Sequence, residues 1–204
     1  MIIKVCGMRE AENIRAIESL GIDLMGFIFY ERSPRYVGKK PDYLPEHCRR
    51  VGVFVNERIG TVLARVREFG LYAVQLHGRE TPEECLSLRN EGLTVIKAFS
   101  IGNKDDLRST GLYEGKCDYF LFDTACTTYG GSGQRFDWSL LRHYHGQTPF
   151  LLSGGIRPES LPDIQAFEHP RLAGIDLNSG FETSPGQKDV SSLKKIINQM
   201  NHLS

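Results

Sequence analysis

A cysteine that ends a short apolar run near the start of the chain is the first residue that could do chemistry. Cys6 closes the segment "IIKVC", and Lys4 lies two residues earlier, on the same side of an extended strand. A free thiol has a pKa of ~8.5, which a neighbouring cation lowers. Cys6 could therefore be a reactive thiolate, a redox centre, a metal ligand or a small buried residue that only packs.

The number and spacing of the cysteines argue against a disulfide framework and a zinc site. The chain has five cysteines, an odd number, and none of them forms a Cys-x-x-Cys pair. They are Cys6, Cys48, Cys85, Cys117 and Cys126. This usage is typical of a reducing compartment. Redox and metal roles for Cys6 are therefore disfavoured, while reactive and packing roles both stay open.

Three further polar residues follow apolar runs and could act with the thiol. Asp123 ends "YFLFD", where a buried carboxyl group is costly unless it is paired, hydrogen-bonded or functional. Partial burial could make it a general acid, or it could cap a loop or helix. Arg35 follows Ser33-Pro34, and its guanidinium could bind a carboxylate through two hydrogen bonds or lie at the surface. His77, in "VQLHG", could contact a substrate, although support of its loop is favoured.

Glycine-rich segments after the last two apolar runs indicate a phosphate site. "LLSGGI" places Gly154 and Gly155 after one run, and "DLNSGFE" places Ser179 and Gly180 after the next. Glycine lets backbone N–H groups approach an anion, although tight turns use it as well. A short helix beginning near Ser179 would direct its first N–H groups at the anion. The loop "YGGSG" at 129–133 could be a lid, a further phosphate contact or an exposed linker.

Short apolar segments alternate with amphipathic ones along the chain and must position these side chains. Eight segments rich in Val, Ile, Leu and Phe are typical of buried parallel strands. They are residues 2–6, 24–30, 51–55, 72–76, 93–99, 118–123, 149–153 and 172–177. Helical spacing predicts helices over 57–69 and 188–202, and Thr81-Pro82 is typical of a helix start.

This pattern, in which each strand is followed by a helical stretch, predicts an α/β fold: a single (β/α)8 barrel domain, or TIM barrel, over residues 1–204. A doubly wound open sheet is the main alternative, but no Gly-x-Gly-x-x-Gly follows the first strand. In a barrel the active site is built from the C-terminal ends of the strands, and strands 7 and 8 carry the usual phosphate loops. Cys6, Asp123, Arg35 and the glycine segments would all fall at that end.

The charge and hydrophobic content limit the partners. The chain has 25 Lys and Arg against 25 Asp and Glu, and 40% of its residues are hydrophobic. A neutral chain without basic clusters argues against binding to nucleic acid or to acidic membrane surfaces. No apolar run approaches ~20 residues and no signal peptide is evident, so we expect a cytoplasmic protein that binds a small molecule.

Seven segments, taken together, resemble the phosphoribosylanthranilate isomerase family. They are "KVCGM" (4–8), "SPRYV" (33–37), "VGVFVN" (51–56), "VQLHG" (74–78), "FDT" with "YGGSGQRFDW" (122–138), "LSGGI" (152–156) and "GIDLNSGFE" (174–182). They run from the first strand to the eighth and cover nearly the whole chain. No single segment decides the resemblance, but the set is specific.

The resemblance implies an acid–base isomerase of L-tryptophan biosynthesis. The reaction would be the Amadori rearrangement of N-(5-phosphoribosyl)anthranilate to 1-(2-carboxyphenylamino)-1-deoxyribulose 5-phosphate. By the same resemblance, Asp123 would protonate the furanose ring oxygen, Cys6 as thiolate would remove the C2 proton, and Arg35 would hold the anthranilate carboxylate.

The resemblance also assigns further residues to the substrate site. Those implied for the phosphate are Gly154, Gly155, Ser179, Gly180 and Gly133, and those implied elsewhere in the substrate site are His77 and Asp176. No metal, nucleotide or organic cofactor is implied. The partner would be the phosphosugar-anthranilate substrate alone, and the protein would be a monomer or a homodimer.

Other phosphosugar enzymes on similar barrels are the nearest alternatives. The indole-glycerol-phosphate synthase and the histidine-pathway isomerase would both keep the phosphate loops. The first relies on a lysine at the mouth and the second on a pair of aspartates, so Cys6 disfavours both. A catalytically silent barrel that binds a phosphometabolite or a partner protein is the alternative from another class. Such a binder would have no evident need for Cys6 and Asp123 together.

Overall fold

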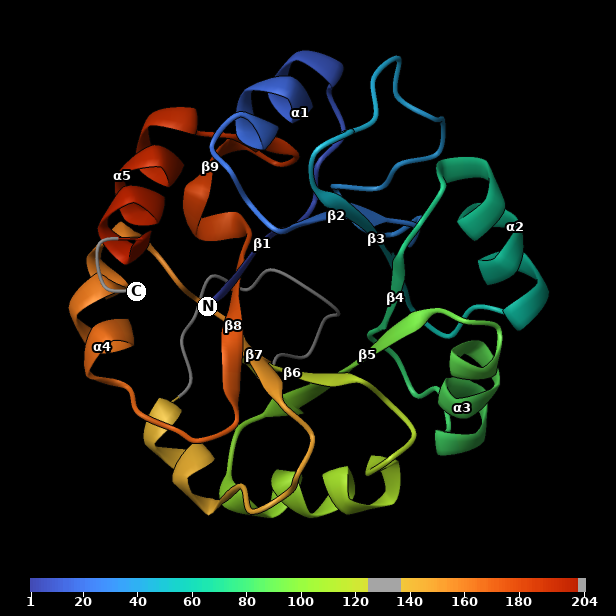
Figure 1. The fold of residues 1–204 in the computed structure, drawn as a ribbon, viewed down its shortest axis with the longest axis vertical. Helices are drawn as coiled ribbons and strands as arrows, with labels where there is room; N and C mark the ends of the chain where they lie inside the picture. Colours follow the sequence, from blue (N-terminus) through green and yellow to red (C-terminus); the bar gives the residue numbers. More distant parts are fainter. Residues whose placement is uncertain (125–136, 202–204) are drawn as a thin grey trace.

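Eight parallel strands close into a barrel, and helices lie around its outside (Figure 1). The computed structural model describes residues 1–124 and 137–201. The strands pair in chain order, and β1 also pairs with β8, which closes the ring. Their bounds are β1 Ile2–Val5, β2 Leu24–Ile28, β3 Arg49–Phe54, β4 Ala73–Leu76, β5 Thr94–Ile101, β6 Tyr119–Thr124, β7 Phe150–Leu152 and β8 Leu172–Leu177. The (β/α)8 prediction is confirmed, and each predicted strand segment overlaps one of these strands.

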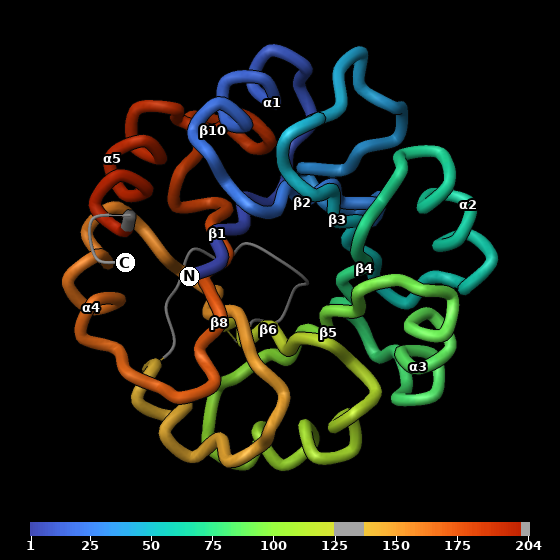
Figure 2. Tube along the Cα trace, viewed as in Figure 1, coloured from blue at the N-terminus to red at the C-terminus, as the bar shows by residue number. Residues whose placement is uncertain are grey.

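The helices around the barrel include both predicted ones. The α-helices are α1 Ala11–Glu18, α2 Ile59–Phe69, α3 Pro82–Asn90, α4 Leu161–Ala166 and α5 Val190–Asn201. The 3₁₀-helices are η1 Lys104–Tyr113, η2 Trp138–His143, η3 Pro158–Ser160 and η4 Ser179–Phe181. A hairpin of β9 Glu182–Ser184 and β10 Gln187–Lys188 follows β8 and lies beside α1 (Figure 2). No helix in the described part of the chain is long and apolar enough to cross a bilayer.

The connection between β2 and β3 differs from the prediction that every strand is followed by a helix, and that prediction is wrong here. Residues 29–48 contain no helix. Three prolines, at positions 34, 41 and 45, interrupt any helical run in this segment because proline lacks the N–H that a helix interior needs. The segment is held instead by Glu18 at the end of α1, whose carboxylate accepts hydrogen bonds from Tyr43 and from the backbone N–H groups of Glu46 and His47.

Side chains on the strands alternate between the helix layer and the barrel interior. The larger core, between strands and helices, holds outward side chains such as Val5, Phe122 and Leu177. A smaller core fills the barrel with inward side chains, among them Leu121 and Leu151. The period of two then points later residues of the same strands inward, toward the C-terminal end. These inward residues, at or just beyond the C-terminal ends of their strands, are Cys6, Gln75, Asp123, Ser153 and Asp176. The sequence predicted Cys6, Asp123 and Asp176 as site residues, but not Gln75 or Ser153.

The start of α3 gives a test of local stability. Thr81 accepts a hydrogen bond from the Glu84 N–H at 3.2 Å, and the Glu84 carboxylate accepts one from the Thr81 N–H at 2.7 Å. We expect Thr81→Ala to destabilise the protein by about 1 kcal/mol, because one of these two capping bonds is lost. Denaturant unfolding measures this. Ser87→Ala, at an exposed position inside the same helix, should leave stability unchanged or slightly higher. Equal losses in the two variants would contradict the capping role.

Candidate active site

Cys6 lies just beyond the end of β1, inside the barrel and next to a buried ion pair. The residue is 3% exposed and packs against Ile28 and Val53. Lys4, two residues earlier on β1, is completely buried, and its Nζ donates to Asp176 Oδ1 at 2.7 Å. The same ammonium also acts electrostatically on the Cys6 thiol. The sequence prediction that Lys4 and Cys6 share one side of the strand is therefore confirmed.

Burial and the neighbouring charges act on the thiol in opposite directions. Burial raises the pKa of Cys6, because the thiolate loses its solvation inside the barrel. Lys4 and Lys188 lower it by stabilising the thiolate, whereas the negative charge of Asp176 raises it further. The net shift is upward, so the resting thiol holds its proton more firmly than a free cysteine does.

Room for the sulfur comes from a glycine on the neighbouring strand. A Cβ atom at Gly26 of β2 would lie 2.6 Å from Cys6 Sγ and 3.1 Å from Cys6 Cα. Any side chain at this position would push the thiol away from its present place, since such separations are shorter than van der Waals contact. Gly26 therefore belongs to the site, although nothing in the sequence singled it out.

Asp123, at the C-terminal end of β6, forms a second polar cluster with two residues of β4 and its loop. Its Oδ1 accepts from the Thr124 N–H at 2.8 Å, and its Oδ2 lies 3.4 Å from His77 Nε2. Gln75 Nε2 lies 2.9 Å from His77 Nδ1, so the imidazole is held between an amide and a carboxylate. His77 thus contacts Asp123 itself, which is more than the support of a loop that the sequence favoured.

Arg35 is buried and faces a carboxylate of its own chain. Its Nε donates to Glu182 Oε1 at 2.9 Å and its Nη2 donates to Glu182 Oε2 at 2.6 Å. The side chain is only 9% exposed, so the alternative of a surface arginine is wrong. Among the described residues none accepts a hydrogen bond from Nη1. The carboxylate fixes the guanidinium along one edge and leaves its terminal Nη1–Nη2 edge for a further acceptor.

The glycine loops after β7 and β8 meet each other. Gly154 and Gly155 both have positive φ, 82° and 62°, a backbone conformation that favours glycine. A Cβ on Gly180 would overlap the backbone oxygen of Ile156, so the two loops are in direct contact. A 3₁₀-helix begins at Ser179, as the sequence predicts. Gly133 and the rest of "YGGSG" lie outside the described residues.

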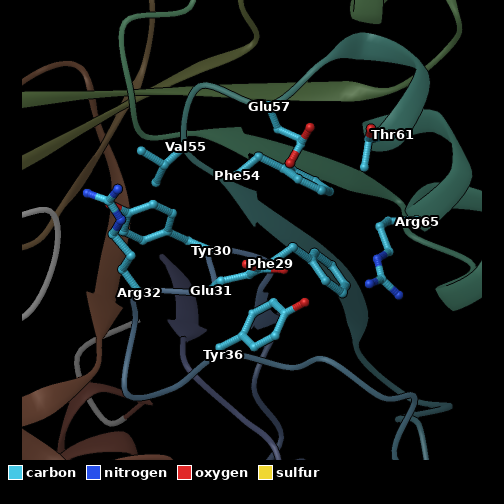
Figure 3. Close-up of a pocket in the computed structure, with 10 residues that line it drawn as sticks. All are labelled: Phe29, Tyr30, Glu31, Arg32, Tyr36, Phe54, Val55, Glu57, Thr61 and Arg65. Atoms are coloured by element: carbon cyan, nitrogen blue, oxygen red, sulfur yellow. The ribbon is translucent and has the colours of Figure 1, made fainter.

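A cavity of about 300 Å³ opens beside the strand ends, between the β2 loop and α2 (Figure 3). The Phe29 and Phe54 rings stack at a centroid distance of 5.1 Å, and Arg65 of α2 reaches toward Phe29. Arg32 and Glu57 are among the other residues that line it. The lining contains none of the predicted catalytic or binding residues, so this cavity is separate from the clusters around Cys6 and Asp123.

Two buried charged residues at this end of the barrel were missed by the sequence reasoning. Glu182 starts β9 and Lys188 ends β10, and their side chains are joined by a 2.6 Å ion pair. The predicted helix over 188–202 included Lys188, but α5 begins at Val190. Pro185-Gly186 is a turn signal that could have indicated the hairpin and so separated Lys188 from the helix.

The fold and these side chains define a class of protein. A closed (β/α)8 barrel with a buried thiol, a carboxyl group and an arginine at the C-terminal ends of its strands is the arrangement of a barrel enzyme with acid–base chemistry at its mouth. Comparison with known proteins narrows this class.

The model of the N-(5'-phosphoribosyl)anthranilate (PRA) isomerase family matches residues 3–199. The N-(5'-phosphoribosyl)anthranilate isomerase of Phocaeicola vulgatus is 62% identical over 200 residues, covering 98% of each chain. A solved structure of monomers generated from the dimeric phosphoribosylanthranilate isomerase of Thermotoga maritima is 32% identical, with a TM-score of 0.82, and covers 99% of this chain and 100% of that one. Phosphoribosyl anthranilate isomerase in complex with reduced 1-(o-carboxyphenylamino)-1-deoxyribulose 5-phosphate is 33% identical, with the same TM-score of 0.82 and the same coverage, 99% and 100%. The chain belongs to the N-(5'-phosphoribosyl)anthranilate isomerase family.

Gly154 offers a test of how the β7 loop holds Asp123 in place. A Cβ here would lie 2.9 Å from Asp123 Oδ1 and 2.6 Å from the Thr124 nitrogen. We expect Gly154→Ala to displace the Asp123 carboxylate and to reduce isomerase turnover by at least about tenfold, the loss that a shift of ~1 Å in a catalytic group readily produces. Steady-state kinetics on the folded variant measures this.

Gly92→Ala is the matched control for backbone strain. Gly92 has nearly the same φ, 83°, and nothing lies within 4 Å of a Cβ placed there. Both variants should lose about 1–2 kcal/mol from the left-handed backbone, but only Gly154→Ala should lose turnover. Wild-type turnover in Gly154→Ala would contradict the proposed packing role.

Proposed function

We propose that the chain converts N-(5-phosphoribosyl)anthranilate into 1-(2-carboxyphenylamino)-1-deoxyribulose 5-phosphate, with Asp123 as general acid and Cys6 as general base. The observation that carries the proposal is the presence, in a member of this isomerase family, of a buried thiol beside Lys4 and of a carboxyl group beside His77, both turned into the same end of the barrel. The reaction belongs to L-tryptophan biosynthesis.

The proposed reaction has two proton transfers. Asp123 gives a proton to the furanose ring oxygen, the C1–O bond breaks, and the ring opens to a Schiff base whose nitrogen carries the positive charge. The Cys6 thiolate then takes the proton from C2, and the electrons of the C–H bond neutralise the iminium to give an enolamine. Tautomerisation of the enolamine yields the ketone. An acid that holds its proton and a base that has lost its proton suit these steps.

Recognition of the anthranilate carboxylate is proposed for Arg35. Glu182 occupies Nε and one hydrogen of Nη2, which orients the guanidinium and leaves the Nη1–Nη2 edge for a second carboxylate. His77 and Asp176 complete the proposed substrate site from β4 and β8. Through its two acceptor bonds, from Lys4 at 2.7 Å and from Ser153 at 3.3 Å, Asp176 also fixes the base side of the site.

The phosphate is proposed to bind at the two touching loops, through Gly154, Gly155, Ser179 and Gly180, with Gly133 as a further contact. Contact between the β7 and β8 loops and the paired positive φ values of the two glycines support this part of the proposal. The full proposal treats residues 1–204 as one barrel domain that works in the cytoplasm, as a monomer or homodimer.

The activity itself is tested with freshly generated phosphoribosylanthranilate. Its anthranilate-type fluorescence should be lost on turnover by the reduced, folded protein. We expect Cys6→Ser and Asp123→Asn each to lower kcat by about 10²–10⁴-fold, the usual contribution of a general acid or base. Asn keeps an oxygen that can accept from the Thr124 N–H, so the loop stays in place while the acidic proton is gone.

Two outcomes would contradict this assignment in different ways. Absence of turnover by the folded wild-type protein would refute the isomerase function. Near-normal kcat in either variant, with unchanged circular dichroism, would refute the role of that residue while leaving the function intact.

Arg35→Ala tests the carboxylate site. We expect KM for phosphoribosylanthranilate to rise about 10–100-fold with a smaller change in kcat, because a charge-assisted contact of about 1.5–3 kcal/mol is lost in ground and transition state alike. Arg32→Ala is the matched control, since Arg32 is exposed, lies in the same loop and lines the separate cavity. An unchanged KM in Arg35→Ala, or an equal rise in Arg32→Ala, would exclude the proposed contact.

A further inference from the structure

A second lysine, Lys188, is as deeply buried as Lys4 and belongs to the same end of the barrel. Its side chain has no exposed surface, and its Nζ donates to Asn178 Oδ1 at 2.7 Å and to Glu182 Oε1 at 2.6 Å. The backbone around it is fixed by Asn13 of α1, which accepts from the Lys188 N–H at 2.8 Å and donates to the Lys188 C=O at 3.0 Å. The ammonium is thus held in one position by elements on both sides of the hairpin.

Glu182 is shared between two cations. Its carboxylate accepts from Lys188 on Oε1 and from Arg35 on both oxygens. Arg35 and Lys188 lower the pKa of Glu182 against the effect of its burial, so the group stays ionised. One negative charge therefore faces two positive ones in this cluster.

The charges around Cys6 consequently do not balance. The groups that act on its thiol are Lys4 on β1, Asp176 on β8 and Lys188 on β10. Lys4 is paired with Asp176, while Lys188 and Arg35 share Glu182. Three cations meet two anions, and the one positive charge left over is buried. An uncompensated buried charge is costly, so this cluster of ion pairs favours the binding of one more anion.

Two anions of the proposed reaction can use that charge. One is the Cys6 thiolate, on which Lys188 acts electrostatically. The other is the substrate carboxylate on the open edge of Arg35, because Lys188 offsets the Glu182 charge that would otherwise neutralise the guanidinium. A lysine present only to fill space would not need two acceptors within 2.7 Å and a carboxylate shared with the proposed carboxylate-binding arginine.

We propose that Lys188 is a positioning residue that supplies the surplus buried charge, and that through Glu182 and Cys6 this one ammonium supports both carboxylate binding and proton abstraction. The inference rests on the proposed function, because it assigns Arg35 and Cys6 their roles in that reaction. Lys188 is thereby added to the proposed site as a residue that acts through Glu182 and Cys6 and not by contact with the substrate.

Lys188→Met tests the proposal by removing the charge while keeping an unbranched side chain. We expect KM for phosphoribosylanthranilate to rise about tenfold or more. Loss of a cation near the thiolate raises the pKa of Cys6, so the acidic limb of the kcat/KM–pH profile should move to higher pH by about one unit, a tenfold change in thiolate fraction at a fixed pH. The rate of Cys6 alkylation by iodoacetamide, followed on the Cys6 peptide by mass spectrometry, should show the same shift without substrate.

A second substitution separates charge from structure. Lys188→Met combined with Glu182→Gln restores one surplus positive charge, now on Arg35. The charge proposal predicts that KM and the acidic limb return part of the way toward wild type. A purely structural role predicts that the double variant has a KM and an acidic limb no closer to wild type than those of the single variant, and that result would overturn the proposal.

If Lys188→Met does not fold, Glu182→Gln is compared with the double variant. The acidic limb of the kcat/KM–pH profile must then lie about one pH unit higher in the double variant.

Lys97 provides the matched control. It is a buried lysine of β5 that pairs with Glu80 at 2.9 Å, outside the barrel interior. Lys97→Met should lower stability as any broken buried pair does, but it should leave the pH dependence of Cys6 alkylation unchanged. An equal alkylation shift in Lys97→Met and Lys188→Met would overturn the proposal. Because alkylation needs no substrate, failure of the wild-type activity would be recognised separately.

Discussion

The buried ion pair between Lys4 and Asp176 is the interaction on which the rest of the structure depends. These two residues are opposite each other in the pairing of β1 with β8, which is the seam that closes the barrel. A shift of that pairing by one residue would turn one of the two charges toward the helix layer. The other would stay in the barrel without a partner, at a cost of about 3–5 kcal/mol. The ion pair therefore selects the closing register, and the closing register places Cys6 at the mouth.

The same geometry explains why so much chemistry gathers at one end. Inward side chains in the N-terminal half of the strands are apolar and fill the barrel. The inward positions that follow, toward the C-terminal ends, carry a thiol, an amide, a hydroxyl and carboxyl groups. Parallel strands bring their C-terminal ends to one face, so residues more than one hundred positions apart in the chain become neighbours. The 2.7 Å contact of Lys4 with Asp176 and the 2.6 Å contact of Arg35 with Glu182 are the clearest cases.

The strands were predictable because strands buried on both faces must be apolar along their whole length. The lack of a helix after β2 was not predicted, because local periodicity does not show that the Glu18 carboxylate holds that segment in an irregular conformation. Arg35 was recognised from its stiff Ser-Pro context, but its partner was not. Glu182 stands in a turn-like segment whose charges resemble those of a solvated surface, and only the folded chain shows that it is buried.

Buried charge in this barrel works against stability and in favour of chemistry. Apolar residues of similar volume in place of a buried ion pair are often neutral or stabilising, by about 1–4 kcal/mol. The fold alone therefore gives no reason for the buried ion pairs Lys4–Asp176 and Arg35–Glu182–Lys188 at this end of the barrel. The proposed base has the opposite need, because burial raises the pKa of Cys6 and nearby cations lower it again. The proposed surplus of cations around Cys6 follows from that conflict: burial disfavours the thiolate, and Lys4 and Lys188 oppose this effect from buried positions that solvent does not screen.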